Sequence, residues 1–391
     1  MTRLRITLPI DRWDPRRGGA ERYLDRLCRD LCARGHEITV LCVAASSGLE
    51  VFPAGLSIES LAVPGFPRWL RELEFARRSA RAHRESGRDL LFAVRHALEA
   101  DVYQPHGGCF RAARHRALQH LSPSPRTAKR LVAECRPAMR VLSWLDRELF
   151  RRSPDVTLIA ISRKVEDEFR ATYPDVAFRF RRLYHGVDTG HFHDRDRESL
   201  ATDLRARQDI PRAHRIAVFL AHRFAPKGLR HVLEALRRAE DWHLLVGGRD
   251  DPRPFRRLAR RLGIGGRVRF LGDVNDSREV LAGADAFVLP TYYDACSLAV
   301  LEALACGTPV VTTTQSGSGE LIEPGRQGFV LERPDQEREL AEALSLIARD
   351  WNAFHRATLD LREKIGWDGH VDGLERILLE AFERNGADSR E

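Results

Sequence analysis

Short apolar runs alternate with amphipathic stretches from the beginning of the chain. Residues 4–10 form an apolar run that predicts a buried strand, and residues 20–33 repeat apolar positions at the spacing of one helix face. Gly35 closes this helix, and a second strand is predicted over residues 37–43. A strand, a loop with glycines, a helix and a strand in this order make a βαβ unit, which predicts a parallel sheet.

The same alternation continues in two series, separated near residues 185–194 by a stretch without periodicity. Further strands are predicted over residues 57–63, 101–105, 156–161, 178–184, 215–221, 243–246, 268–271, 286–289 and 309–313. A final helix is predicted over residues 371–384. A chain of 391 residues with two such series predicts two α/β domains rather than one.

Composition places the chain among globular enzymes, with 43% apolar and 31% charged residues. No apolar run approaches the roughly 20 residues that span a bilayer, and residues 6–10 are too few for the core of a signal peptide. We therefore expect a cytoplasmic protein. The seven cysteines are odd in number and lack CxxC spacing, which favours buried apolar roles over disulfides or zinc, so no metal site is predicted.

The formal charge of +8 comes almost entirely from arginine and implies an acidic partner. This partner could be nucleic acid, an anionic membrane surface or a phosphorylated substrate. Phe66, Trp69, Leu70 and Leu73 fall at the spacing of one helix face and have arginines around them. Such a helix could lie on an anionic membrane or pack on its own domain, and the pattern does not choose between the two.

The most informative segment is residues 290–311, PTYYDACSLAVLEALACGTPVV, in which a buried strand leads through a short polar loop into a helix. We expect the helix to begin at Leu298, with Ser297 as its N-cap. The backbone N–H groups of Leu298 and Ala299 would then lie unpaired at the positive end of the helix, where a diphosphate binds well.

Two carboxylates bracket this helix start. Glu302, one turn inside, can accept hydrogen bonds from ribose hydroxyls, and Asp294, before the helix, can accept them from a neighbouring sugar. An acid pair on the surface around an ordinary helix start is the alternative.

Arg223 and Lys227 lie between a predicted strand and an amphipathic helix, in HRFAPKGLRHVLEAL. Cations there can reach an anion at the carboxyl end of the sheet, where ligands of open α/β folds bind. They could stabilise the charge on a leaving diphosphate in place of a divalent metal. A solvated pair on a surface loop is the alternative.

Glycines and a histidine in the first domain also follow predicted strands. Gly18 and Gly19 would let the backbone approach a bound diphosphate or acceptor, although GG alone is a weak signal. The absence of GxGxxG counts against a dinucleotide-dependent dehydrogenase. His106, in QPHGG, either contacts the sugar or has a structural role.

Taken together, these motifs resemble the retaining GT-B glycosyltransferases of family 4. The resemblance rests on GGAER, on HGVD at residues 185–188, on the Arg223 and Lys227 pair, and on the Asp294 and Glu302 pair. Residues 245–290 look most similar to the lipopolysaccharide core glucosyltransferases.

The resemblance implies an α/β fold of two facing Rossmann-like domains, each with a parallel sheet. Residues 1–186, with a final helix over residues 366–391 that crosses back, would bind the acceptor. Residues 187–365 would bind the nucleotide sugar.

The resemblance also implies a role for each site residue. The diphosphate would be held by Arg223 and Lys227, the ribose by Glu302, and the donor sugar by Asp294 and the backbone of Ser297, Leu298 and Ala299, with Gly18, Gly19 and His106 near the transferred sugar. The family usually has Glu at the position of Asp294 and often has Phe-Gly where this chain has Cys296-Ser297. These departures bear on the identity of the donor sugar.

The function implied is a retaining transfer of a hexose, glucose from UDP-glucose, without metal or other cofactor. The acceptor would be a carbohydrate such as the lipopolysaccharide core, at the inner face of the cytoplasmic membrane. Two alternatives remain, a GT-B nucleotide-sugar epimerase and a basic membrane- or nucleic-acid-binding module without catalysis. The sequence contains no RNA- or DNA-binding motif, so nucleic acid is not an expected partner.

Overall fold

The computed structural model describes residues 2–14, 18–45, 52–121 and 136–388, which form two compact units. Unit 1 comprises Met1–His115, Pro123–Leu183 and His370–Glu391, and unit 2 comprises Arg116–Ser122 and Tyr184–Gly369. The segment Arg116–Ser122 lies in unit 2, whereas the boundary predicted at residue 186 assigns it to the first domain.

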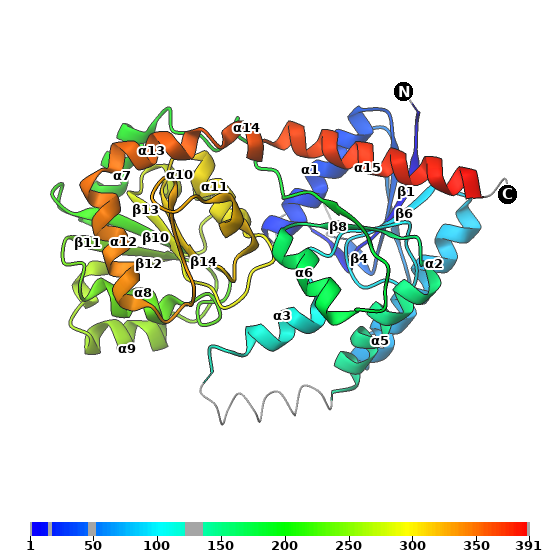
Figure 1. Ribbon diagram of the computed structural model, residues 1–391, viewed down its shortest axis with the longest axis horizontal. Coiled ribbons are helices and arrows are strands. Elements are labelled where there is room, and N and C mark those ends of the chain that lie inside the picture. Colours follow the sequence, from blue (N-terminus) through cyan, green and yellow to red (C-terminus); the bar gives the residue numbers. More distant parts are fainter. Residues whose placement is uncertain (1, 15–17, 46–51, 122–135, 389–391) are drawn as a thin grey trace. The chain divides into compact units, whose positions relative to one another are not determined.

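The described part of unit 1 is built on a seven-stranded parallel sheet (Figure 1). In spatial order its strands are β5 (Leu56–Ser60), β3 (Glu37–Cys42), β1 (Arg5–Pro9), β6 (Leu90–Ala93), β7 (Val102–Tyr103), β8 (Thr157–Ala160) and β9 (Arg179–Arg182). Ile6 of β1 lies opposite Ile38 on one side and Leu90 on the other. The order of strands therefore reverses between β1 and β6, which makes this the topological switch point of the sheet. A separate pair, β2 (Arg12–Trp13) and β4 (Ala44–Ala45), is also parallel.

Amphipathic helices cover the sheet of unit 1. They are α1 (Gly19–Ala33), α2 (Arg68–Ser86), α3 (Phe110–Ala117), α5 (Pro137–Arg152), α6 (Arg163–Thr172) and α15 (Trp367–Asp388). In α1 the buried positions Leu24, Leu27 and Leu31 recur on one face, and the chain turns sharply after the helix at Gly35, with φ of 96°. On the other helices, Ala76 and Ala80 of α2 pack in one core cluster with Leu145 of α5.

The C-terminal helix α15 joins unit 1 from His370 onward. The Tyr23 hydroxyl lies 2.6 Å from Nε2 of His370, and Arg34 Nη1 donates to Glu375 at 2.5 Å. His36 Nε2 lies 2.9 Å from the same carboxylate. The prediction that the last helix returns to the first domain is therefore confirmed.

Unit 2 contains, in its described residues, a six-stranded parallel sheet. In spatial order the strands are β12 (Val268–Gly272), β11 (Trp242–Gly247), β10 (Arg215–Leu220), β13 (Ala286–Leu289), β14 (Val310–Thr313) and β15 (Gly328–Leu331). Around them lie α7 (Arg197–Gln208), α8 (Leu229–Leu236), α9 (Arg253–Arg261), α10 (Ser277–Ala282), α11 (Leu298–Ala305), α12 (Glu337–Arg349), α13 (Trp351–Leu359), α14 (Arg362–Ile365) and two 3₁₀ turns, η1 (Gly265–Arg267) and η2 (Gly317–Leu321). Here the switch point lies between β10 and β13.

Hydrogen bonding joins the two ends of the long segment of unit 2, Tyr184–Gly369. Val187 and Gly366 form a parallel bridge, and the Val187 N–H donates to the Ile365 carbonyl at 2.9 Å. The chain therefore enters and leaves this segment at the same place.

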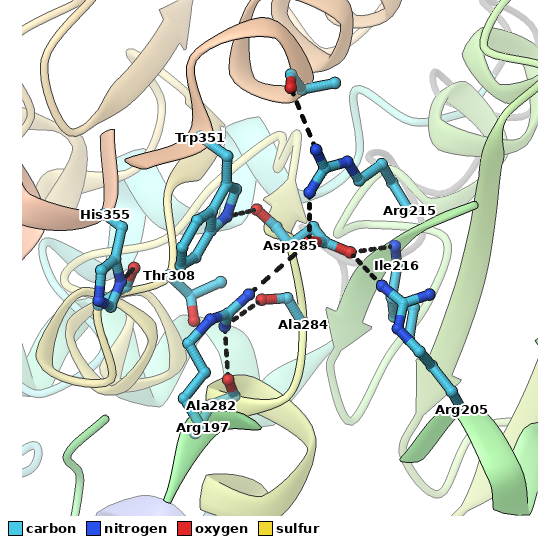
Figure 2. Close-up of polar contacts among 12 residues, drawn as sticks. Arg197, Arg205, Arg215, Ile216, Ala282, Ala284, Asp285, Thr308, Trp351 and His355 are labelled. Carbon is cyan, nitrogen blue, oxygen red and sulfur yellow. Dashed lines mark hydrogen bonds and ion pairs between the residues drawn. The ribbon is translucent and has the colours of Figure 1, made fainter. Parts of the chain in front are cut away.

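A buried carboxylate organises the amino end of β13 (Figure 2). Asp285 is 3% exposed, and three arginines converge on it. The nitrogens of Arg205 and Arg215 lie 3.1 Å from its oxygens and that of Arg197 lies 3.7 Å away. The Ile216 N–H donates to the same carboxylate at 2.8 Å. The Asp285 carboxylate thus links α7 to the amino end of β10.

The surroundings satisfy much of the remaining hydrogen-bonding capacity of these arginines. Arg197 donates to the carbonyls of Ala282, the last residue of α10, and of Ala284, at 2.5 and 2.7 Å. Its guanidinium lies 3.9 Å from the ring centroid of Trp351, whose indole N–H donates to the Asp285 carbonyl at 2.9 Å. Burial lowers the pKa of Arg197 to about 10, an effect that Asp285 opposes, so the group stays charged at neutral pH.

Candidate functional site

Two loops at the switch point of unit 2 carry most of the residues predicted from the sequence. One follows β10 over residues 221–228 and the other follows β13 over residues 290–297. Because β10 and β13 are parallel neighbours, both loops leave the same edge of the sheet. This is the position at which open α/β sheets bind ligands.

A glycine allows these loops to touch. Gly228 has φ of 83°, and a Cβ atom there would lie 2.0 Å from the carbonyl oxygen of Pro290. Across the same contact the Tyr292 N–H donates to the Pro226 carbonyl at 3.0 Å. Any side chain at residue 228 would push the loops apart.

Lys227 and Asp294 meet where the loops touch. The Lys227 ammonium lies 2.5 Å from Oδ2 of Asp294 and donates to the Tyr293 carbonyl at 3.0 Å. Both side chains keep some exposure, 25% and 18%. Arg223, on the same loop, is exposed and forms no ion pair with any described residue. Thus the structure brings Lys227 and Asp294 together as an ion pair and leaves Arg223 in solvent.

The backbone of Asp294 is fixed by the segment after β14. Its N–H donates to the Gln315 carbonyl at 2.9 Å, and its carbonyl accepts from Gly317 at 3.0 Å. Two residues on, Cys296 is buried, and this burial raises the pKa of its thiol to about 12. The thiol therefore stays protonated and is a poor nucleophile.

The start of α11 agrees with the prediction in position but not in every contact. Ser297 is the N-cap residue, yet its side chain makes no capping hydrogen bond. Instead its own N–H donates to Oγ of Ser318 at 2.6 Å, and the Ser318 hydroxyl donates to the Ser297 carbonyl at 3.1 Å. Within the ranges that the structure describes, the N–H groups of Leu298 and Ala299 have no acceptor. They are available to an anion.

Glu302 lies one turn inside α11 and is oriented by a residue that the sequence did not single out. Ser277, the first residue of α10, donates from Oγ to the Glu302 carboxylate at 3.0 Å. Glu302 is partly exposed, so the carboxylate can accept further hydrogen bonds from a ligand.

The other predicted residues belong to unit 1. Gly18 is the N-cap residue of α1 and Gly19 its first residue, after β1 at the switch point of that sheet. His106 follows β7; its Nε2 lies 3.3 Å from the Gln104 amide oxygen and its ring meets the Tyr23 ring edge-on at 5.2 Å.

Burial, with a smaller effect of His370, lowers the pKa of His106 to about 3. At neutral pH the imidazole is therefore uncharged and acts as a hydrogen-bonding group rather than a cation. The Gln104 amide nitrogen beside it is buried without a partner. The Gln104 amide could therefore donate a hydrogen bond to a polar ligand.

In the part of the chain that is described, no three His, Cys, Asp or Glu side chains gather as metal ligands would. Nor is any helix of those residues long and apolar enough to cross a bilayer.

Comparison with known proteins shows which family models and relatives the sequence matches. Residues 17–191 match the family model described as Glycosyltransferase Family 4, and residues 214–350 match the model described as Glycosyl transferases group 1. The lipopolysaccharide glucosyltransferase WaaG of Escherichia coli is 24% identical over 84% of this chain and 85% of its own. The lipopolysaccharide core biosynthesis glycosyltransferase LpsE of Rhizobium meliloti is 32% identical over 46% of this chain and 50% of its own.

Solved structures share the fold. The crystal structure of WaaG superimposes with a TM-score of 0.76 at 22% identity, covering 95% of this chain and 99% of that one. Anabaena Alr3699/HepE in complex with UDP gives 0.71 at 18% identity, with 96% and 100% covered. The predicted GT-B fold of two Rossmann-like domains with parallel sheets is confirmed, and the chain belongs to the glycosyltransferases of family 4 and group 1.

Proposed function

We propose that this enzyme transfers glucose from UDP-glucose to a carbohydrate acceptor of the cell envelope, such as a lipopolysaccharide core, with retention of configuration and without a metal. The observation that carries the proposal is the start of α11, where the N–H groups of Leu298 and Ala299 are available near the Lys227 and Asp294 pair. Two relatives bear names of lipopolysaccharide synthesis, and HepE has been crystallised with UDP-glucose.

Each group has a distinct task in the proposed mechanism. Lys227, Arg223 and the amides at the start of α11 stabilise the charge that grows on the leaving diphosphate. Asp294 accepts hydrogen bonds from the sugar, and Glu302 accepts them from the ribose.

The acceptor hydroxyl attacks the anomeric carbon from the face that the diphosphate leaves. The glycosidic bond forms as the bond to the phosphate oxygen breaks, and that oxygen takes the proton of the hydroxyl. No covalent enzyme intermediate is needed, in keeping with the protonated Cys296 thiol.

The test is release of nucleotide from UDP-, GDP- and ADP-sugars by the purified protein. We expect slow hydrolysis of UDP-glucose, and Glu302→Ala should raise the KM for this donor at least about tenfold, because it removes a charged acceptor. Glu332→Ala, an exposed site on unit 2, is the matched control. Equal KM values in the two variants, or hydrolysis of another donor alone, would contradict the assignment. Formation of an epimer of the donor sugar in the absence of acceptor would instead identify an epimerase.

We further infer that unit 1 contacts an anionic membrane surface. Of the apolar positions singled out in the sequence, Trp69, Leu70 and Leu73 are partly buried, whereas Phe66, just before α2, is 87% exposed. The side chain of Arg81 on the same helix is 73% exposed. An exposed aromatic ring directly before a helix that carries exposed arginines suits an interface with anionic lipid.

We expect Phe66→Ser to reduce sedimentation with vesicles of anionic phospholipid about tenfold, because burial of an aromatic side chain contributes about 1.5–3 kcal/mol. Leu346→Ser, which changes an exposed apolar residue of unit 2, is the control. Equal binding of wild type and both variants would show that Phe66 does not enter the membrane.

A further inference from the structure

A pocket of about 530 Å³ lies in unit 2 beside the loop that carries Lys227. Ala225 of this loop and Tyr292 of the loop after β13 contribute to its lining, whereas Lys227, Asp294 and Glu302 do not. The pocket is therefore distinct from the proposed donor site, although it shares the two loops that build that site.

One wall of the pocket is basic. Arg230, Arg237 and Arg238 come from α8 and the residues that follow it, and all three are exposed. Arg230 and Arg238 form no ion pair with a described residue, and Arg237 has only a loose contact of 3.8 Å with Glu234. Guanidinium groups with free donors bind phosphate strongly, and often through two hydrogen bonds.

The rest of the lining combines aromatic rings with two carboxylates, Glu234 and Glu337. Phe255 of α9 and Tyr292 present aromatic rings, and the His120 ring meets the Tyr292 ring at a centroid distance of 6.2 Å. Sites of this kind, with aromatic walls and a few polar groups, hold small ligands such as sugars.

The floor of the pocket is a hydrogen-bonded chain. His231 is 9% exposed; its Nδ1 lies 2.6 Å from the Glu337 carboxylate and its Nε2 lies 2.8 Å from the Tyr292 hydroxyl. Because a carboxylate only accepts, Nδ1 donates to Glu337, while Nε2 and the Tyr292 hydroxyl share the second hydrogen bond. This chain holds the Glu337 side chain in place at the floor of the pocket.

We propose that this pocket is a second ligand site, which binds a phosphorylated sugar through Arg230, Arg237 and Arg238 and the faces of Phe255 and Tyr292. Two sources share this chemistry, a phosphorylated residue of the glycan acceptor and a free sugar phosphate. Tyr292 lies two residues before Asp294 and hydrogen-bonds to Pro226, next to Lys227, so an occupied pocket adjoins the groups that hold the donor.

The test is calorimetric titration of the full-length protein with glucose 6-phosphate, glucose and inorganic phosphate. We expect glucose 6-phosphate to bind more tightly than either fragment, and Arg230→Gln/Arg238→Gln to weaken this binding at least about tenfold. The matched control is Arg257→Gln/Arg261→Gln, which removes two exposed arginines of unit 2 outside the pocket. Equal weakening in both double variants, or no binding of glucose 6-phosphate by the wild type, would overturn the proposal.

A second measurement separates this site from the donor site. UDP-glucose is titrated into the same samples, and both double variants should bind it as the wild type does. If the wild type binds glucose 6-phosphate but not UDP-glucose, the pocket is supported and the proposed donor is contradicted. If it binds UDP-glucose but not glucose 6-phosphate, only the proposal for the pocket is overturned.

Transfer kinetics distinguish the two sources of the ligand, a phosphorylated acceptor and a free sugar phosphate. Competition between glucose 6-phosphate and a phosphorylated core oligosaccharide identifies an acceptor subsite, and an effect on donor turnover without competition identifies a free effector. Either result supports the site.

Discussion

Lys227→Met is expected to lower the turnover of the nucleotide sugar by about 100- to 1,000-fold, with a much smaller change in donor binding. The ammonium is held at the end of its loop by Asp294 and the Tyr293 carbonyl, and is thus oriented before any ligand arrives. A cation fixed in advance stabilises the charge that develops on the leaving diphosphate more than the charge already present in the bound donor.

The measurement is kcat and donor KM with acceptor in excess, together with the melting temperature, because the variant leaves Asp294 without its partner. Lys364→Met, an exposed lysine of the same unit, is the matched control. Equal losses in kcat/KM and donor affinity, with kcat unchanged, would assign Lys227 to ground-state binding alone.

The second large effect concerns stability. Asp285→Ala should destabilise unit 2 by about 3–5 kcal/mol, since it leaves three arginines without the carboxylate that neutralises them. Asp285→Asn, which keeps an acceptor for the Ile216 N–H, should lose less.

Hydrogen exchange of the amides of β10 and β13 reports on unit 2 alone, and urea unfolding gives the free energy of unfolding. Asp203→Ala, an exposed aspartate on α7, is the control. If Asp285→Ala exchanged no faster than this control, the buried cluster would contribute no net stability.

The strands could largely be predicted because strands of a parallel sheet are buried on both faces and appear as continuous apolar runs. Phe219 of β10 and Val246 of β11 are examples, since both are fully buried. β6 and β15 were missed, as were the two-residue strands β2 and β4. A short apolar run does not by itself distinguish strand from helix, and β13 and β14, which also have four residues, were nevertheless predicted. The omission of β6 matters, since it forms the switch point of unit 1 with β1.

The site could be predicted only as far as strand ends reveal it. Lys227 and Asp294 could be placed at the same edge of the sheet because each follows a predicted strand, and the carboxyl ends of parallel strands share one edge. Their ion pair depends on the close approach at Gly228, and the backbone hydrogen bond of Ser297 depends on Ser318, from the segment after β14. Contacts between distant segments leave no local signal, although a glycine directly before α8 was a hint of such an approach.

The path of the chain also bears on the order in which the protein folds. The long segment of unit 2, Tyr184–Gly369, is closed by the Val187 and Gly366 bridge, whereas unit 1 needs α15 to pair with Tyr23, Arg34 and His36. During synthesis on the ribosome, the segment that completes unit 1 is therefore made after unit 2. Unit 2 can reach its native state while unit 1 is still incomplete, which reverses the usual order in which the domain begun first is finished first.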